Sequence, residues 1–126
     1  MTVTDFKQSQ VALACWRAAQ TELHQTMLAV CQVFLNRAAA GWYDGDLYEN
    51  CYHWLEENPG EFPDTRDPQF QQLLSRIDSV TSKLVSDVTG RAIYFVPKVD
   101  FDEAILPSQY SITTTIGSLV FIKGRE

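Results

Sequence analysis

Residues 24–40 read HQTMLAVCQVFLNRAAA and carry apolar side chains at most positions. On a helix these side chains fall on almost every side, and Gly41 follows as a natural helix end. A helix that is apolar all round is normally enclosed by other elements. We therefore expect residues 24–40 to form the central helix of the fold.

Three further helices are expected around this central one. They are predicted at residues 6–20, 46–57 and 67–84, where apolar side chains recur at helical spacing. Asp46 and Asp67 are suited to cap the last two helices, and Pro68 fits a first helical position. The first half of the chain is thus predicted to be mainly helical.

The last quarter of the chain is predicted to form strands. Residues 92–96 read as a short strand ended by Pro97. Residues 111–116 and 119–123 flank Gly117-Ser118, and glycine in the first position is typical of a type II′ hairpin turn. We expect a single α+β domain over residues 1–126, mainly helical, with a small antiparallel β-sheet at its C-terminal end.

Composition and charge exclude several classes of protein. The 126 residues suffice for one buried core, and no apolar run is long enough to span a bilayer, so we expect no membrane partner. The net charge of -6 repels phosphate backbones, which argues against nucleic acid as a binding partner. Residues 1–10 lack the pattern of a secretory signal. The chain is expected in the cytoplasm, or outside it after non-classical or phage-type release or removal of a leader.

The cysteines give no sign of a metal or disulfide framework. Cys15, Cys31 and Cys51 are an odd, low number, so we expect them to be buried as small apolar side chains. Cys51 and His53 are too few ligands for zinc, and neither a nucleophile set nor a phosphate loop is present. No metal and no cofactor are expected.

Three short motifs carry a resemblance to a known family. They are Leu35-Asn36-Arg37 at the end of the central helix, residues 89–95 (TGRAIYF) and residues 116–121 (IGSLVF). In their order and spacing they resemble the spore-cortex-lytic (SleB-type) cell wall hydrolases, over roughly residues 11–123. The resemblance implies a lysozyme-like or lytic-transglycosylase-like fold that acts on peptidoglycan glycan strands, with a groove between the end of the first helix and the sheet.

The family's catalytic glutamate is the main point of departure. Counted back from Asn36 without gaps, its position falls on Ala18, and a second family glutamate falls on Glu22. Alanine cannot protonate the leaving oxygen of a glycosidic bond. Glu22 is the candidate catalytic acid if the alignment slips, and it is otherwise a carboxylate favoured near a helix start. Ala18 is either a natural or an engineered substitution.

Other residues are candidates for a binding groove. Trp42 and Tyr43 follow Gly41 in a loop and suit a platform on which sugar rings stack. Tyr94 either lines the cleft or faces the core. A run of acidic residues either supplies a second carboxylate across the cleft or is a solvated loop with a helix cap; it comprises Glu56, Glu57, Glu61, Asp64 and Asp67. The hydroxyl-rich residues 113–115 border the groove or face solvent.

Three functions follow from these observations. The first is a glycan hydrolase or lytic transglycosylase with Glu22 as its acid. The second is a catalytically inactive relative that binds glycan or a protein partner, as Ala18 suggests. The third is a phage-type accessory or structural protein that uses the fold as a scaffold.

Overall fold

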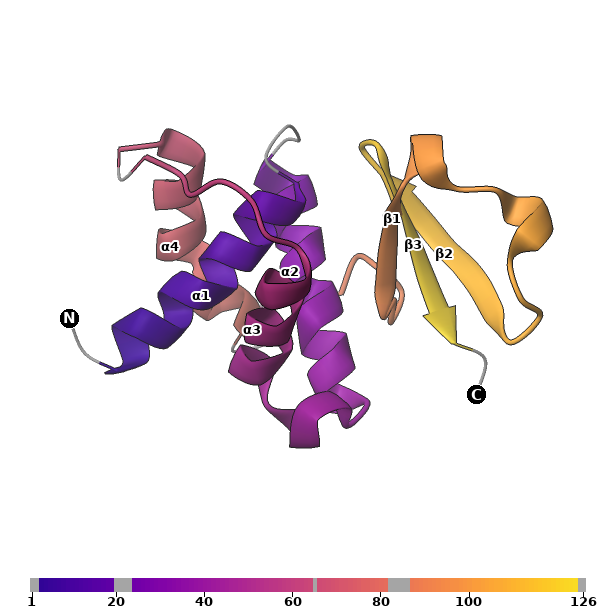
Figure 1. Ribbon diagram of the computed structural model, residues 1–126, viewed down its shortest axis with the longest axis horizontal. Coiled ribbons are helices and arrows are strands. Elements are labelled where there is room, and N and C mark those ends of the chain that lie inside the picture. The colour runs from indigo at the N-terminus through magenta and orange to yellow at the C-terminus, as the bar shows by residue number, and fades with distance from the viewer. Residues whose placement is uncertain (1–2, 20–23, 65, 82–86, 125–126) are drawn as a thin grey trace.

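The computed structural model describes residues 3–19, 24–64, 66–81 and 87–124. Within these ranges four helices gather on one side of the molecule and a three-stranded antiparallel sheet on the other (Figure 1). The helices are α1 (Val3–Ala18), α2 (His24–Ala39), α3 (Leu47–Glu57) and α4 (Pro68–Thr81). The strands are β1 (Tyr94–Pro97), β2 (Tyr110–Ile116) and β3 (Leu119–Gly124). The expected α+β class is confirmed.

Helix α2 is the central helix, as its composition predicts. It contacts α1, α3, α4 and β1, and in Figure 1 it lies between the other helices and the sheet. Met27, Val30 and Phe34 are fully buried on it. A helix that is apolar on every side can bury its whole surface only when other elements surround it. This explains why the rest of the chain packs around α2.

The predicted helix caps are present. The Asp46 carboxylate accepts hydrogen bonds from the backbone N–H groups of Tyr48 (2.8 Å) and Glu49 (3.0 Å), and Asp67 accepts one from Phe70 at 3.0 Å. Each cap satisfies donors that have no partner inside the first helical turn. The side chain of Glu49 pairs with His53 at 3.3 Å rather than turning back to Asp46.

The sheet has the strand order β1-β3-β2, so β3 is its central strand. Ile116 pairs with Leu119 across the turn, and Gly117 has a φ of 59°, as the first position of a type II′ turn requires. The register of β2 shifts between Ile112 and Thr114. The hydroxyl of Thr113, at that shift, donates to the carbonyl of Phe121 at 3.2 Å, so this hydroxyl has a structural partner.

The two faces of the sheet have different coverings. Phe95, Leu119 and Phe121 pack into the main core with the helices. On the other face, Tyr94, Val96 and Ile122 line a pocket of about 360 Å³ together with Leu106 and Pro107 of the long β1–β2 connection and Tyr110, the first residue of β2. That connection includes two short 3₁₀ turns, Lys98–Asp100 and Glu103–Ile105. The sheet is therefore a middle layer between the helices and this connection.

Asn36 and Arg37, at the end of α2, tie that helix to the segment that leads into β1. The Asn36 amide donates to the Thr89 hydroxyl (3.2 Å) and to the Ala92 carbonyl (2.8 Å), and the Arg37 Nε donates to the Ile93 carbonyl at 2.7 Å. Thr89 and Ala92 are fully buried. The first two motifs of the family resemblance therefore meet in space, where they fix β1 against α2.

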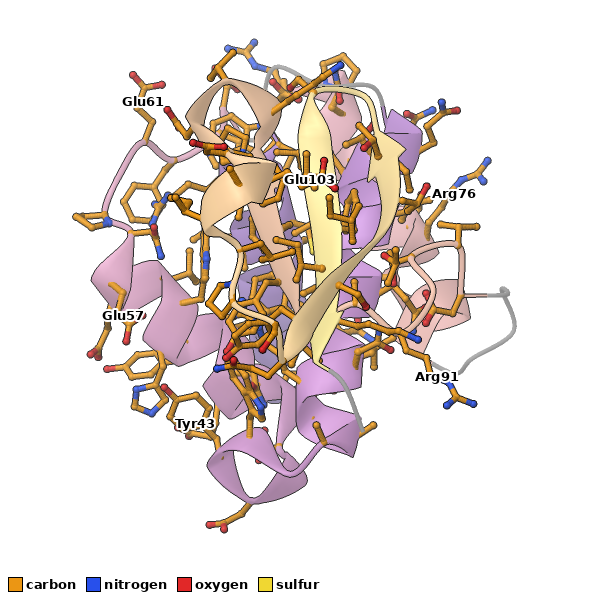
Figure 2. All side chains as sticks on the ribbon, turned by 90° about the vertical axis from the view of Figure 1, so that its right-hand side faces the viewer. Tyr43, Glu57, Glu61, Arg76, Arg91 and Glu103 are labelled. Carbon is orange, nitrogen blue, oxygen red and sulfur yellow. A yellow bond between two sulfur atoms is a disulfide. The ribbon has the colours of Figure 1, made fainter. Side chains whose placement is uncertain are left out.

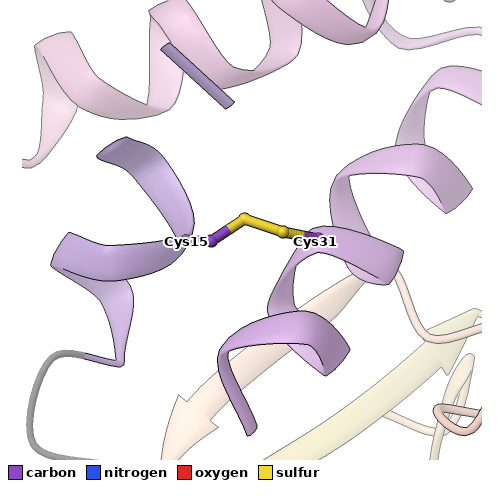
Figure 3. The surroundings of a disulfide bond; sticks show 2 residues. All are labelled: Cys15 and Cys31. Atoms are coloured by element: carbon purple, nitrogen blue, oxygen red, sulfur yellow. A yellow bond between two sulfur atoms is a disulfide. The ribbon is translucent and has the colours of Figure 1, made fainter. Parts of the chain in front are cut away.

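A disulfide joins α1 to α2 and corrects one expectation from the sequence. Cys15 and Cys31 are bonded through their sulfur atoms, with their Cα atoms 5.6 Å apart (Figure 3). All three cysteines are buried as expected, but only Cys51 is a free thiol. The disulfide was not expected because the number of cysteines is odd and because sequence spacing alone does not show which helix faces pack together.

No helix in the described ranges combines the length and the apolar character that a membrane crossing needs.

Candidate functional site

A pocket of about 600 Å³ opens where α1 and α3 end beside β1. It is lined by Arg17, Ala18, Trp54, Glu57, Asn58, Pro59, Gly60, Phe95 and Pro97, and we call it the Ala18 pocket. This is the position between the end of the first helix and the sheet where the resemblance implies a groove. Ala18, the residue on which the sequence resemblance would place a catalytic glutamate, is one of its walls.

Arg17 builds the outer wall of the Ala18 pocket by holding the loop that follows α3. Its guanidinium donates to the backbone carbonyls of Asn58 (3.3 Å), Gly60 (3.2 Å) and Glu61 (2.9 Å). A Cβ atom at position 60 would lie 3.2 Å from the Arg17 side chain, so glycine allows this close approach. With a further bond from Nε to Glu61 at 3.2 Å, four hydrogen bonds from one planar group to three carbonyls make the loop a fixed wall.

Glu57 is the acidic side chain that lines the Ala18 pocket. It is exposed at the C-terminal end of α3, in the acidic run that the sequence offered as a source of a second carboxylate. Its neighbours in that run have other partners: Glu56 binds Tyr52, and Asp67 caps α4. Glu22, the acid proposed from the sequence, lies outside the described residues.

Aromatic rings form the floor of the pocket and continue beyond it. Trp54 and Phe95 line the pocket with their ring centroids 6.0 Å apart. Trp54 shares the apolar face of α3 with Leu47, Cys51 and Leu55, and this helical spacing predicts a place in the core. It packs against the core but remains half-buried, so one part of its ring is available to the pocket.

The structure pairs the aromatic residues differently from the expected platform of Trp42 and Tyr43. Trp42 and Tyr94 meet edge to face with centroids 5.6 Å apart, and Tyr94 meets Tyr110 in the same way at 5.6 Å. Tyr43 instead stacks on His53, with the rings 4.1 Å apart and 5° from parallel. The structure therefore brings together two of the three expected aromatic residues.

The loop that carries Trp42 has an unusual backbone. Gly41, Tyr43, Asp44 and Gly45 all have positive φ, and for Tyr43 (52°) and Asp44 (58°) the left-handed conformation is strained. The buried Asn50 side chain donates to the carbonyls of Trp42 (3.0 Å) and Asp46 (2.7 Å). Asn50 thereby holds the loop closed at both ends, which fixes the position of Trp42.

Figure 2 shows how the labelled side chains are distributed. Tyr43, Glu57 and Glu61 follow one another along one side of the molecule, whereas Arg76 and Arg91 lie on the opposite side. The Ala18 pocket and the Trp42 loop are therefore on the same side of the fold, separated from these two cations.

Burial and hydrogen bonds set the chemistry of two polar side chains near the aromatic rings. Burial, and then a hydrogen bond with Tyr110, raise the pKa of the Tyr94 hydroxyl, which stays neutral at physiological pH. Burial also raises the pKa of the Cys51 thiol, so Cys51 behaves as an apolar side chain. Within the described ranges no group of three or more His, Cys, Asp or Glu residues is arranged to hold a metal ion.

Three residues at or beside the site were not expected there from the sequence: Arg17, Arg37 and Trp54. Arg37 had a readable signal, because it is the one Lys, Arg, Asp or Glu residue in the apolar stretch 24–39. A lone charge in a helix enclosed by others needs a specific environment. Arg17 gave no comparable signal, since its partners are backbone carbonyls more than 40 residues away.

Comparisons of this chain with protein-family models, with curated proteins and with solved structures found no match.

Proposed function

We propose that this chain is a cell wall hydrolase-like protein that binds a peptidoglycan glycan strand in the Ala18 pocket and cleaves it with Glu57 as the acid. The observation that carries the proposal is the composition of this pocket. It combines a carboxylate with two aromatic rings at the place where the family resemblance implies a catalytic groove.

The reaction requires a carboxyl group at the leaving oxygen. Cleavage of a glycosidic bond begins with proton donation to that oxygen, followed by attack of water or of a substrate hydroxyl. Ala18 has no proton to give. Glu57 lines the same pocket from α3, so a sugar seated on Trp54 and Phe95 would lie within its reach. In this proposal the carboxylate of α3 replaces the one that α1 has lost.

The disulfide supports a site of action outside the cytoplasm. Disulfides persist in oxidising compartments and are rare where thiols are kept reduced. Cys15–Cys31 lies in the core between α1 and α2, as expected of a structural bond in a protein that meets the cell wall from outside.

A second candidate function is favoured by Ala18 itself. An alanine in the catalytic position, with the aromatic floor kept, is the pattern expected of a relative that binds glycan without cutting it. In that case Glu57 would contribute to binding, and the partner would be the glycan strand alone or a protein that displays it.

The deciding experiment is mass spectrometry of soluble products after incubation of the purified protein with peptidoglycan. Wild type is compared with Glu57→Gln, with Glu22→Gln and with Glu56→Gln as the matched control. Glu56 is on the same helix but binds Tyr52 and does not line the pocket. Removal of a general acid lowers the rate by about 10²- to 10⁴-fold, so only Glu57→Gln should lose product release.

Each outcome has a distinct meaning. Anhydro-muropeptides would identify a lytic transglycosylase, and reducing ends would identify a hydrolase. Loss of activity in Glu22→Gln instead of Glu57→Gln would move the acid to Glu22. If folded wild type releases nothing but co-sediments with peptidoglycan, the binding function replaces the catalytic one. Absence of both release and co-sedimentation would reject both and favour a scaffold role.

A further inference from the structure

Arg37 lies in a cage of aromatic rings at the end of α2. Its guanidinium carbon is 4.8 Å from the ring centroid of Trp42 and 5.6 Å from that of Tyr94. Phe34 and Phe95 complete the cage at 5.5 and 5.9 Å. Phe95 also lines the Ala18 pocket, so the cage and the pocket share one ring.

The charge of Arg37 has no carboxylate partner in the described part of the chain. The ion pairs found there are His53–Glu49 and Arg66–Asp64. The carbonyl end of α2 offers Arg37 only the partial negative charge of a helix C-terminus. Burial consequently lowers the pKa of the guanidinium, and attraction to Tyr94, Cys51 and Glu57 offsets this only in part.

The donors of Arg37 are used unequally. Its Nε donates to the carbonyl of Ile93 at 2.7 Å, which fixes the plane of the guanidinium. The two terminal nitrogens of Arg37 have no hydrogen-bond partner in the described residues. They are also not fully buried, because the buried side-chain atoms without a partner do not include them. A guanidinium with one edge anchored and its end open presents parallel N–H donors to an incoming group.

We propose that Arg37, together with Trp42 and Tyr94, forms a binding site for a carboxylate group of the ligand. A carboxylate is planar and accepts two parallel hydrogen bonds from a guanidinium, and it supplies the missing negative charge. The rings exclude water from the ion pair and offer an apolar surface to the atoms attached to the carboxylate. Binding of a carboxylate at this site does not require that the ligand be cleaved.

The choice of ligand rests on the proposed function. Peptidoglycan carries carboxylates on its glycan and on its stem peptides, such as the lactyl group of an unsubstituted muramic acid and the peptide C-terminus. N-acetylmuramic acid and N-acetyl-D-alanyl-D-alanine represent these sources. N-acetylglucosamine is the neutral control, because it shares the sugar ring of N-acetylmuramic acid without the lactyl group.

The test is a titration of wild-type protein followed by NMR signals of the Arg37 Nε–H and the Trp42 indole N–H. At least one of the two carboxylates should shift both signals saturably, and raised salt should weaken the binding. N-acetylglucosamine should leave the Arg37 signal in place. The carboxylate that shifts the signals identifies the source. If neither shifts them more than N-acetylglucosamine does, the site is refuted without recourse to any variant.

Variants separate this site from a purely structural role. Arg37→Lys keeps the charge but loses the planar fork, so affinity should fall about tenfold or more. Arg76→Gln is the control variant, because Arg76 is exposed on α4, on the opposite side of the molecule from Tyr43 and Glu57 (Figure 2). This variant should bind the carboxylate with the affinity of wild type. Equal binding by folded Arg37→Lys and wild type would overturn the assignment. Carboxylate binding without glycan cleavage would reject only the cleavage reaction.

Discussion

The side-chain amide nitrogen of Asn36 lies 2.8 Å from the backbone carbonyl oxygen of Ala92, and this hydrogen bond joins α2 to the residues that precede β1. The same nitrogen reaches the Thr89 hydroxyl at 3.2 Å. The pocket and the aromatic cage both use residues of β1 and of the helices, so their geometry depends on this connection.

Replacement of Asn36 by alanine should therefore destabilise the whole fold. Asn36→Ala leaves the buried Ala92 carbonyl without its side-chain donor, and an unsatisfied buried group costs about 1–3 kcal/mol. Urea unfolding should show a loss of this size. Gln32→Ala is the control, since Gln32 bonds only to Asn36 in this network, at 3.1 Å, and should lose less than about 1 kcal/mol. Equal losses in the two variants would contradict the assigned role.

Asp87 should make stability depend on acid pH. Partial burial alone would raise its pKa, but hydrogen bonds from the Thr89 hydroxyl, the N–H groups of Thr89 and Arg91, and the Asn36 amide lower it below the ordinary 3.8. A lowered pKa means that the folded state favours the carboxylate. This stabilisation is present above the unfolded value and is lost as the pH falls through the folded one.

The measurement is urea unfolding of wild type and Asp87→Asn at a series of pH values. The difference in unfolding free energy should be largest at neutral pH and should shrink below about pH 4, where the unfolded chain begins to bind the proton. A difference that stays constant from neutral to acid pH would show that the charge of Asp87 contributes nothing.

The disulfide should be detectable by thiol counting. The sequence contains three cysteines, and Cys15–Cys31 uses two of them, so unfolding without reductant should expose one thiol, that of Cys51. After reduction three thiols should react. Detection of three thiols before reduction would show that the pair is open.

Reduction of Cys15–Cys31 should also lower stability. The bond closes a loop with a sequence separation of 16, and a loop of about 15 residues is worth about 3 kcal/mol in the chain-entropy model. Thermal unfolding with and without reductant checks this. The double variant Cys15→Ala/Cys31→Ala should unfold at the same temperature whether or not reductant is present.

Ala18→Glu should introduce or raise glycan cleavage if the Ala18 pocket is a retained catalytic groove. The new carboxyl would project from the end of α1 into a pocket of about 600 Å³, so the fold should tolerate it. Release of muropeptides is the readout, and Ala18→Gln is the matched control without an acid. No gain in a folded Ala18→Glu protein that still binds peptidoglycan would mean that the groove has lost the geometry for cleavage.

Local sequence signals predicted much of the fold because they act within a few residues. Asp46 and Asp67 cap the helices that follow them, and Gly117 adopts the positive φ that its turn requires. The candidate functional site was harder to predict from the sequence. Trp42 and Tyr43 were expected on one platform, but Tyr43 stacks on His53, ten residues away on α3, and Trp42 instead meets Tyr94. Helical spacing suggested only the core for Trp54, although its ring also lines the pocket.

Local patterns in the chain were enough to predict the central position of α2, the helix caps, the hairpin and the mainly helical α+β class, because each depends on periodicity or on hydrogen bonds between near neighbours. Three relationships became visible only once the chain was folded: Cys15 pairs with Cys31, Glu57 shares a pocket with Ala18, and aromatic rings surround Arg37. These relationships join segments far apart in the chain. Which side chains meet there is set by how whole helix and sheet faces pack, and the residues themselves carry no local mark of it.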